Sequence, residues 1–208
     1  MSFNHSQTFS ISTSNNTELD NVTDFKYLGS WVGSNEKDIK ARKAAAWRAC
    51  NKLDKIWNSS LSRPFKLRVF AATVESVLTY GCEAWTLSPR LSKSLDGCYT
   101  RMLRKVLNIS WKQHLTNKEL YGDLPKLSHK ISVRRRRFAG HCYRSKKEPV
   151  SKLVLWTPKH GTRSRGKPTT NFIDILCKDT GLQADDLGVA MEDRTVWRTF
   201  LTRRSTST

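Results

Sequence analysis

Acidic residues are scarce in this sequence. Its 208 residues contain 18 Asp and Glu against 37 Lys and Arg, which gives a formal net charge of +19. No stretch approaches the roughly 18 consecutive apolar residues that a membrane-spanning helix needs, and the first thirty residues lack the segments of a secretory leader. We therefore expect an intracellular protein, nuclear or cytoplasmic, that is neither secreted nor bound to a membrane.

Motifs for catalysis are also missing. The chain has no Gly-rich phosphate loop ending in Lys-Ser or Lys-Thr. The acidic pairs Asp185-Asp186 and Glu192-Asp193 are neighbours in sequence, and neighbouring side chains on a helix diverge instead of chelating one metal ion. We therefore expect no catalytic residue, no cofactor, no metal site and no small-molecule substrate in this chain.

The five cysteines include no Cys-X-X-Cys pair, and in a reducing compartment they should be free thiols. A zinc site could be formed by His141 and Cys142 with Cys82 or Cys177. Structural zinc sites usually show a short paired-ligand spacing, which is absent here. Packing inside the protein is the favoured role of these cysteines.

Apolar residues make up 38% of the chain, with seven Trp and eight Phe, which is enough to bury a core. An edge strand is predicted over 23–32, followed by amphipathic helices over about 34–57, 62–80 and 88–106. Ser34 or Asn35, Ser62 and Ser88 can cap these helices, and Gly81 ends the second. Joined by short turns, the three helices can form an antiparallel bundle.

The C-terminal half is predicted to be helical around one extended segment. A capping box at Thr116 and Glu119 begins a short helix. The next helix should place Ile131 and Phe138 on its apolar stripe. Residues 145–169 combine basic residues and prolines with few periodic apolar residues, which predicts an extended basic arm, and two final helices follow over 170–180 and 184–203.

Basic residues are concentrated over 134–167, which contains twelve Lys and Arg and a single acid, Glu148. Four consecutive arginines span roughly 300° of arc on a helix, so we expect all four to be exposed. Such a field attracts polyanions, and guanidinium groups bind phosphate oxygens in a bidentate way. The predicted phosphate contacts are Arg134, Arg135, Arg136, Arg137, Arg144, Arg163, Arg165 and Lys167.

Other readings of these residues remain open. The basic helix could be a solvated face without a ligand. Residues 165–168 (RGKP) could insert two cations into a narrow minor groove, or form a plain flexible turn. Trp111 or Trp156 could stack on unpaired bases, although we expect tryptophans at these positions to belong to the core.

Several segments resemble, in order, the region that follows the palm of non-LTR (LINE-type) retrotransposon reverse transcriptases. They are residues 24–30 (DFKYLGS), 66–70 (KLRVF), 77–85 (VLTYGCEAW), 134–144 (RRRRFAGHCYR), 155–158 (LWTP) with 165–168 (RGKP), and 193–198 (DRTVWR). The resemblance covers about residues 23–202. Residues 1–20 match nothing in the family, as expected if a truncated copy is read from an arbitrary start, and Lys167 replaces the usual Arg.

The resemblance implies a thumb-like bundle and a C-terminal region that holds template RNA and target DNA. The family's palm with its Asp-Asp motif, its fingers and its endonuclease all precede the matching segments. No polymerase or nuclease residue can therefore be carried over to this chain. The parent polymerase would need Mg²⁺, but the ligands for it are not in this sequence.

These observations predict a mainly α fold with an edge strand, a thumb-like three-helix bundle, an Arg-rich helix, an extended basic arm and two C-terminal helices. The chain divides into a disordered lead-in over 1–22, the bundle over 23–110 and a basic nucleic-acid-binding region over 111–204. We expect a reverse transcriptase fragment that lacks the palm, is inactive alone and binds RNA or DNA. The alternatives are a transcribed relic without function and an adopted minor-groove DNA-binding protein.

Overall fold

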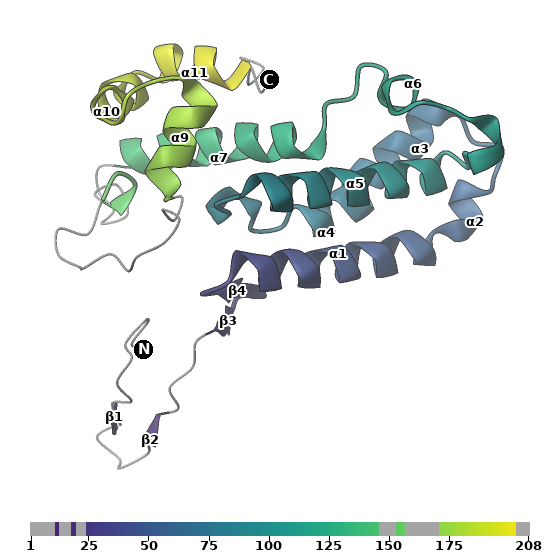
Figure 1. Cartoon of the computed structure of the whole chain (residues 1–208), viewed down its shortest axis with the longest axis horizontal. Coiled ribbons are helices and arrows are strands. Elements are labelled where there is room, and N and C mark those ends of the chain that lie inside the picture. Colours follow the sequence, from purple (N-terminus) through teal and green to yellow (C-terminus); the bar gives the residue numbers. More distant parts are fainter. Residues whose placement is uncertain (1–10, 13–17, 20–23, 146–152, 157–170, 203–208) are drawn as a thin grey trace.

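The computed structural model describes residues 11–12, 18–19, 24–145, 153–156 and 171–202, and this part of the chain is mainly helical, as predicted (Figure 1). In chain order the elements are β1 (Ile11–Ser12), β2 (Glu18–Leu19), β3 (Phe25–Tyr27), β4 (Ser30–Val32), α1 (Asn35–Lys52), α2 (Asp54–Trp57), α3 (Arg63–Phe70), the π-helical η1 (Ala71–Glu75), α4 (Ser76–Leu78), the 3₁₀ turn η2 (Cys82–Ala84), α5 (Pro89–Val106), the 3₁₀ turn η3 (Trp111–Gln113), α6 (Asn117–Tyr121), α7 (Leu127–Arg144), α9 (Phe172–Thr180), α10 (Ala184–Glu192) and α11 (Arg194–Thr202). No helix in the described ranges has the length and apolar content needed to cross a membrane.

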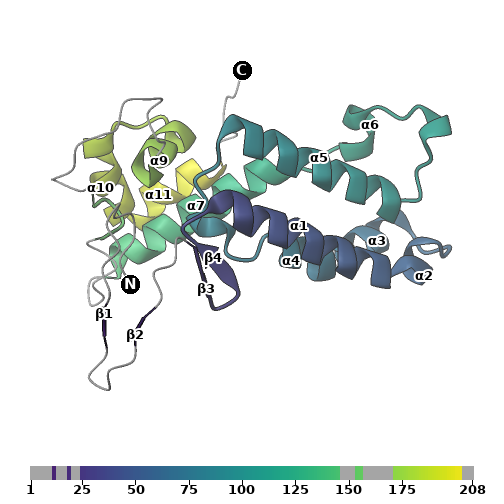
Figure 2. The same ribbon diagram turned by 60° about the horizontal axis from the view of Figure 1, so that its bottom comes forward.

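The three helices predicted for the first half pack together as a bundle, formed by α1, the continuous α3–η1–α4 and α5 (Figure 2). The Ser34 and Ser88 hydroxyls cap α1 and α5 by accepting hydrogen bonds from backbone N–H groups. The second helix ends at Leu78, and Gly81, in the turn before η2, has a left-handed φ of +71°, which glycine adopts without steric cost. The caps predicted at Ser34 and Ser88 are therefore confirmed, whereas Ser62 precedes α3 without a capping hydrogen bond from its side chain.

α7 connects two separate cores. Its first half contributes Leu127 and Ile131 to the bundle core, and its second half contributes Ala139 to a core shared with α9, α10 and α11. Trp197 of α11 is 1% exposed in this second core. Because one unbroken helix enters both cores, it fixes the position of the C-terminal helices relative to the bundle (Figure 1).

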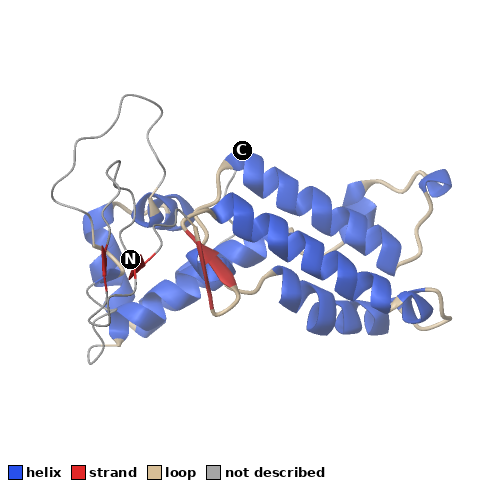
Figure 3. Cartoon of the chain, turned by 90° about the horizontal axis from the view of Figure 1, so that it is seen from below, coloured by secondary structure: helices blue, strands red, loops and turns tan. Residues whose placement is uncertain are grey.

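A hairpin, and not the single edge strand predicted over 23–32, precedes α1 (Figure 3). Its strands β3 and β4 are joined by Leu28 and Gly29, which have φ values of +46° and +87°. Turns of this kind usually carry Asn-Gly or Asp-Gly. Here the first turn position is a leucine, so the sequence lacks the usual turn signal. The pattern over 23–32 therefore predicted one continuous apolar strand.

Buried Asp38 of α1 attaches the hairpin to the bundle. Its carboxylate accepts hydrogen bonds from the Ser30 hydroxyl at 3.2 Å, the Trp31 backbone N–H at 3.1 Å and the Trp85 indole N–H at 2.8 Å. The residue is 2% exposed. Asp38 therefore joins β4, α1 and the segment after η2, which come from three separate stretches of the sequence.

The C-terminal segment contains three helices, which corrects the prediction of two. Asp193 has extended backbone angles, φ −85° and ψ 114°, and separates α10 from α11. Its carboxylate accepts hydrogen bonds from the backbone N–H groups of Thr195 and Val196 at 2.6 and 3.2 Å. An aspartate satisfies the free N–H groups at a helix start better than it serves a helix interior, so the chain restarts here.

Two predicted segments lie largely outside the described residues. In the expected lead-in over 1–22, the structure describes only β1 and β2, which pair in antiparallel orientation. In the expected basic arm over 145–169, it describes Ser145 and residues 153–156, of which Val154 and Leu155 pack against the second core. Arg163, Arg165 and Lys167 are outside the described residues.

The five cysteines are free thiols, four of them buried and Cys177 half-buried. Burial raises the pKa of the Cys82 thiol to about 11, so this group stays protonated and unreactive near pH 8. We expect a thiol reagent at pH 8 to label the native protein slowly, with Cys177 first, and to label all five thiols rapidly in guanidinium chloride. Rapid labelling of the buried thiols without denaturant would contradict this packing.

Candidate functional site

The four consecutive arginines of α7 lie in different environments. Arg135 and Arg136 are 3% and 0% exposed, whereas Arg134 and Arg137 are exposed. The expectation that all four face solvent is wrong for Arg135 and Arg136, and Phe138, expected on the apolar stripe, is 46% exposed. The reason is that α9 and α11 pack against this side of α7, which the periodicity of α7 alone does not reveal.

The two buried arginines bind groups of the protein itself. Arg135 pairs with the Asp179 carboxylate at 2.7 Å. The Arg136 guanidinium donates to the backbone carbonyls of Ser132, Asp179 and Phe200, the last two in the final turns of α9 and α11. A cation at a helix C-terminus satisfies carbonyls that lack an intrahelical partner and interacts favourably with the helix dipole.

Burial lowers the pKa of both guanidinium groups, and the Asp179 carboxylate opposes this shift. Arginine nevertheless keeps its proton in proteins, so both groups are buried cations that need internal partners. Because both side chains are buried, an external phosphate cannot reach them. We therefore remove Arg135 and Arg136 from the set of phosphate contacts and assign them to the packing of α7 against α9 and α11.

Two further arginines of α7 also contact helix ends. Arg144 donates to the Met191 carbonyl at 2.7 Å, in the last turn of α10. Arg134 donates to the Thr79 hydroxyl at 2.6 Å and to its carbonyl at 3.3 Å, where α4 ends. These two arginines of α7 thus stabilise the packing of α7 against the ends of α10 and α4.

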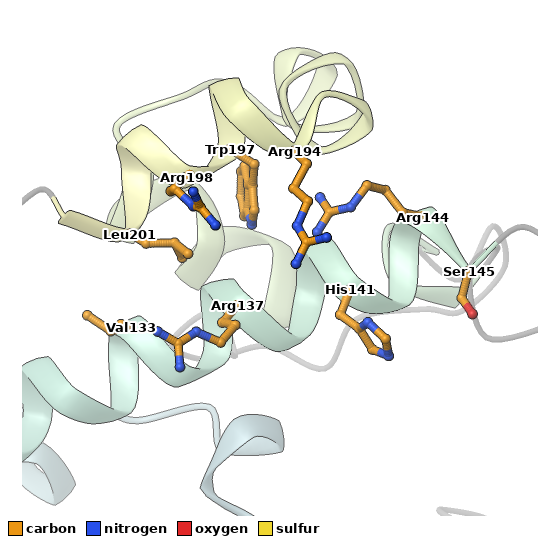
Figure 4. A pocket seen from close by; sticks show the side chains of 9 residues that line it. All are labelled: Val133, Arg137, His141, Arg144, Ser145, Arg194, Trp197, Arg198 and Leu201. Carbon is orange, nitrogen blue, oxygen red and sulfur yellow. The ribbon is translucent and has the colours of Figure 1, made fainter.

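A pocket of about 900 Å³ lies between α7 and α11. Its walls are Val133, Arg137, His141, Arg144 and Ser145 from α7 and its C-terminal cap, and Arg194, Trp197, Arg198 and Leu201 from α11. Figure 4 shows Arg194 and Arg198 extending from α11 toward α7, where Arg137 and Arg144 project. We call this site the basic pocket.

The basic pocket contains four arginines and one histidine, and none of the described residues that line it is acidic. Arg137, Arg194 and Arg198 form no ion pair within the described parts of the chain. Guanidinium groups that converge without a counterion repel one another, and a bound anion removes this repulsion. The planar donor fork of arginine matches phosphate or carboxylate oxygens, so the pocket is chemically suited to a polyanion.

Local features of α11 and α7 place these cations. Arg194 and Arg198 are one helical turn apart and therefore share a face. Between them, the Trp197 indole N–H donates to the Arg136 carbonyl at 2.8 Å, which fixes the rotation of α11. Opposite the indole is Gly140, where a Cβ would lie 2.3 Å from Trp197 Nε1. The absence of a side chain at Gly140 lets the two helices approach closely enough to form the pocket.

Of the residues predicted from the sequence, Arg137 and Arg144 come together in the basic pocket. Arg134 lies instead beside the bundle, on Thr79. Arg194 and Arg198 are not among the predicted site residues, and His141 is predicted only as a possible zinc ligand. The first two lie in the 193–198 segment (DRTVWR), whose one-turn spacing of two arginines around a tryptophan could have indicated them.

In the parts of the chain that the structure describes, no three His, Cys, Asp or Glu side chains gather as a metal site. His141 lines the basic pocket, whereas the next residue, Cys142, is buried. Adjacent residues of a helix point in different directions. The arrangement of these residues therefore does not support a zinc site at His141 and Cys142.

Comparison with known proteins links the chain to transposable elements. The sequence is 26% identical over 212 residues to an uncharacterized, transposon-derived protein of Caenorhabditis elegans, a match that spans 94% of this chain and 76% of the relative. Neither a protein-family model nor a solved structure matches the chain. The similarity supports a transposon origin.

Proposed function

We propose that this chain derives from a non-LTR retrotransposon reverse transcriptase and that it binds the phosphate backbone of nucleic acid through the basic pocket. The order of the family-like segments and the similarity to a transposon-derived protein support the origin. The observation that carries the binding function is the convergence of four arginines from α7 and α11, with no acidic side chain among the described residues of the pocket. Such a site favours a ligand with several closely spaced negative charges, as in a nucleic-acid backbone.

In this proposal Arg137, Arg144, Arg194 and Arg198 contact phosphate oxygens. Ser145 lines the pocket, and the basic stretch over 146–167 follows it directly in the chain. Arg163, Arg165 and Lys167 of that stretch, and Arg134 on α7, are proposed as additional phosphate contacts. Such contacts position the nucleic acid without reading its sequence. Any polymerase chemistry would come from a palm that this chain does not contain.

Binding should depend strongly on salt because phosphate contacts release condensed counterions. Neutralising ~6 phosphates of duplex DNA predicts a slope near −5 in a plot of log K against log salt concentration. Fluorescence anisotropy with a labelled duplex between about 50 and 200 mM salt measures this slope. A slope near zero, or no binding at the lowest salt, would reject the proposal.

The pocket itself is tested by an Arg194→Ser/Arg198→Ser double variant. Loss of two phosphate contacts should reduce the magnitude of the salt slope by about 2 and weaken binding roughly 10- to 100-fold at low salt. The matched control is Lys55→Ser/Arg101→Ser, which removes the same charge from exposed positions on α2 and α5. Equal weakening in both variants would show that net charge, and not the pocket, drives binding.

A second candidate is a relic that folds without a present function. The observation in its favour is apolar exposure at the hairpin, where Tyr27 and Leu28 are 60% and 76% exposed. Exposed apolar surface of this kind is expected where a neighbouring domain has been lost. Salt-dependent binding together with cooperative thermal unfolding would argue against the relic, and a broad, non-cooperative melt without binding would support it.

A further inference from the structure

Trp111 is 78% exposed, and Trp156 is 61% exposed, so the expectation that both belong to the core is wrong. Trp111 begins η3 in the connection between α5 and α6. This connection lies at the end of the molecule away from α10 and α11 (Figures 1 and 2). The exposed indole is therefore distant from the basic pocket and belongs to a different surface.

Hydrogen bonds hold the backbone around Trp111 in one conformation. The Arg104 guanidinium donates to the Leu115 carbonyl at 2.7 Å and to the Asn117 side chain at 3.0 Å. The Ser110 hydroxyl accepts from the Lys112 backbone N–H and caps η3. The indole is thus presented to solvent by an ordered turn, and its apolar surface loses the stabilisation that burial would supply.

A second, smaller pocket adjoins this turn. It measures about 240 Å³, and its lining includes Ser110, the residue directly before Trp111. Its lining is mostly polar and comprises Asp54, Trp57, Asn58, Arg104, Lys105, Asn108, Ile109 and Ser110. Residues 104–118 contain four Lys and Arg and no acid. Lys105 is paired with the Asp54 carboxylate at 2.9 Å and Arg104 is bonded within the turn, so the positive charge next to Trp111 comes from Lys112, which is exposed. An exposed aromatic face, hydrogen-bonding amides and positive charge therefore occur side by side.

We propose that Trp111 stacks on an unpaired base of single-stranded nucleic acid, with Lys112 beside it contacting the strand's phosphates. The proposal rests on the function proposed above and deepens it by adding a contact specific for single strands. An aromatic platform within a basic surface is the combination that single-strand binding uses. A duplex cannot engage it in the same way, because its bases are stacked on one another. An apolar protein partner would not need the surrounding cations.

The experiment compares three probes of equal length with the full chain: a 20-nucleotide single strand, an abasic single strand and a duplex. Replacing Trp111 with alanine should weaken binding of the base-bearing strand roughly 5- to 100-fold, the range found for loss of one stacked base. Trp111→Phe should keep most of the affinity, because a phenyl ring still stacks. Phe65→Ala removes a 40% exposed aromatic from α3 and serves as the matched control.

Affinity for the abasic strand and the duplex should stay unchanged in Trp111→Ala. If this variant binds the base-bearing strand as tightly as the original protein, or loses equal affinity for the abasic strand, stacking is overturned while the backbone-binding proposal stands. If the original protein binds none of the three probes, the proposed nucleic-acid binding is wrong, and the stacking proposal is wrong with it. Capture of an apolar peptide at Trp111, with no effect on nucleic acid, would also overturn the proposal.

Discussion

Replacing Gly140 with alanine is expected to lower the free energy of unfolding by about 2–4 kcal/mol, although alanine is the better helix former. The gain in helix propensity is about 1 kcal/mol. Against it, the new Cβ would lie 2.3 Å from Trp197 Nε1 and 2.4 Å from Cδ1, so the indole must move. Trp197 is 1% exposed and hydrogen-bonded to the Arg136 carbonyl, and displacing a buried tryptophan costs up to about 3–5 kcal/mol.

The matched control for this prediction is Gly97→Ala, on the exposed side of α5, where a Cβ meets no atom within 4 Å. This variant should be stabilised by up to about 1 kcal/mol. For a chain of this size the melting temperature changes by roughly 2–4 °C per kcal/mol, so the two variants should shift it in opposite directions. Equal shifts would show that α7 and α11 are not in close contact at Gly140.

Gly140→Ala should also weaken nucleic-acid binding, because a displaced α11 moves Arg194 and Arg198 away from Arg137. None of these arginines is replaced in the variant. Binding is measured by anisotropy well below the melting temperature, with Gly97→Ala again as the control. If the Gly140→Ala protein is destabilised but keeps its affinity for nucleic acid, the basic pocket is not the binding site.

Replacing Asp38 with alanine is expected to destabilise the protein by about 3–5 kcal/mol, the cost of removing one member of a buried polar network. The Trp31 backbone N–H and the Trp85 indole N–H, both donors to this carboxylate, would lose their acceptor. Buried donors without a partner retain the full desolvation penalty. Denaturant unfolding measures the loss, and tryptophan fluorescence reports the changed surroundings of Trp31 and Trp85.

Glu36→Ala provides the comparison for Asp38, because it removes an acid from the same first turn of α1. Glu36 pairs with Arg90 in an exposed position, where the two side chains are 64% and 76% exposed. Exposed ion pairs contribute at most about 1 kcal/mol, so the midpoint of unfolding should shift little. A loss of stability in Glu36→Ala as large as in Asp38→Ala would contradict the anchoring role of Asp38.

The sequence alone determined the helices whose signals are local. Ser34, Ser88 and the capping box of Thr116 and Glu119 act within three residues of themselves, and each is found where it was predicted. Gly81 likewise takes a left-handed conformation in the turn between α4 and η2, which depends only on its own backbone. These interactions require nothing from distant parts of the chain, which is why pattern and spacing were sufficient.

Tertiary structure alone decided which cations face solvent. The run of Arg134, Arg135, Arg136 and Arg137 looked uniform, yet two of its members are buried because α9 and α11 cover them. The basic pocket joins residues of α7 and α11, and the bond that sets their spacing links positions 61 residues apart. Burial and convergence depend on how helices pack over such separations, whereas periodicity describes only the face of a single helix.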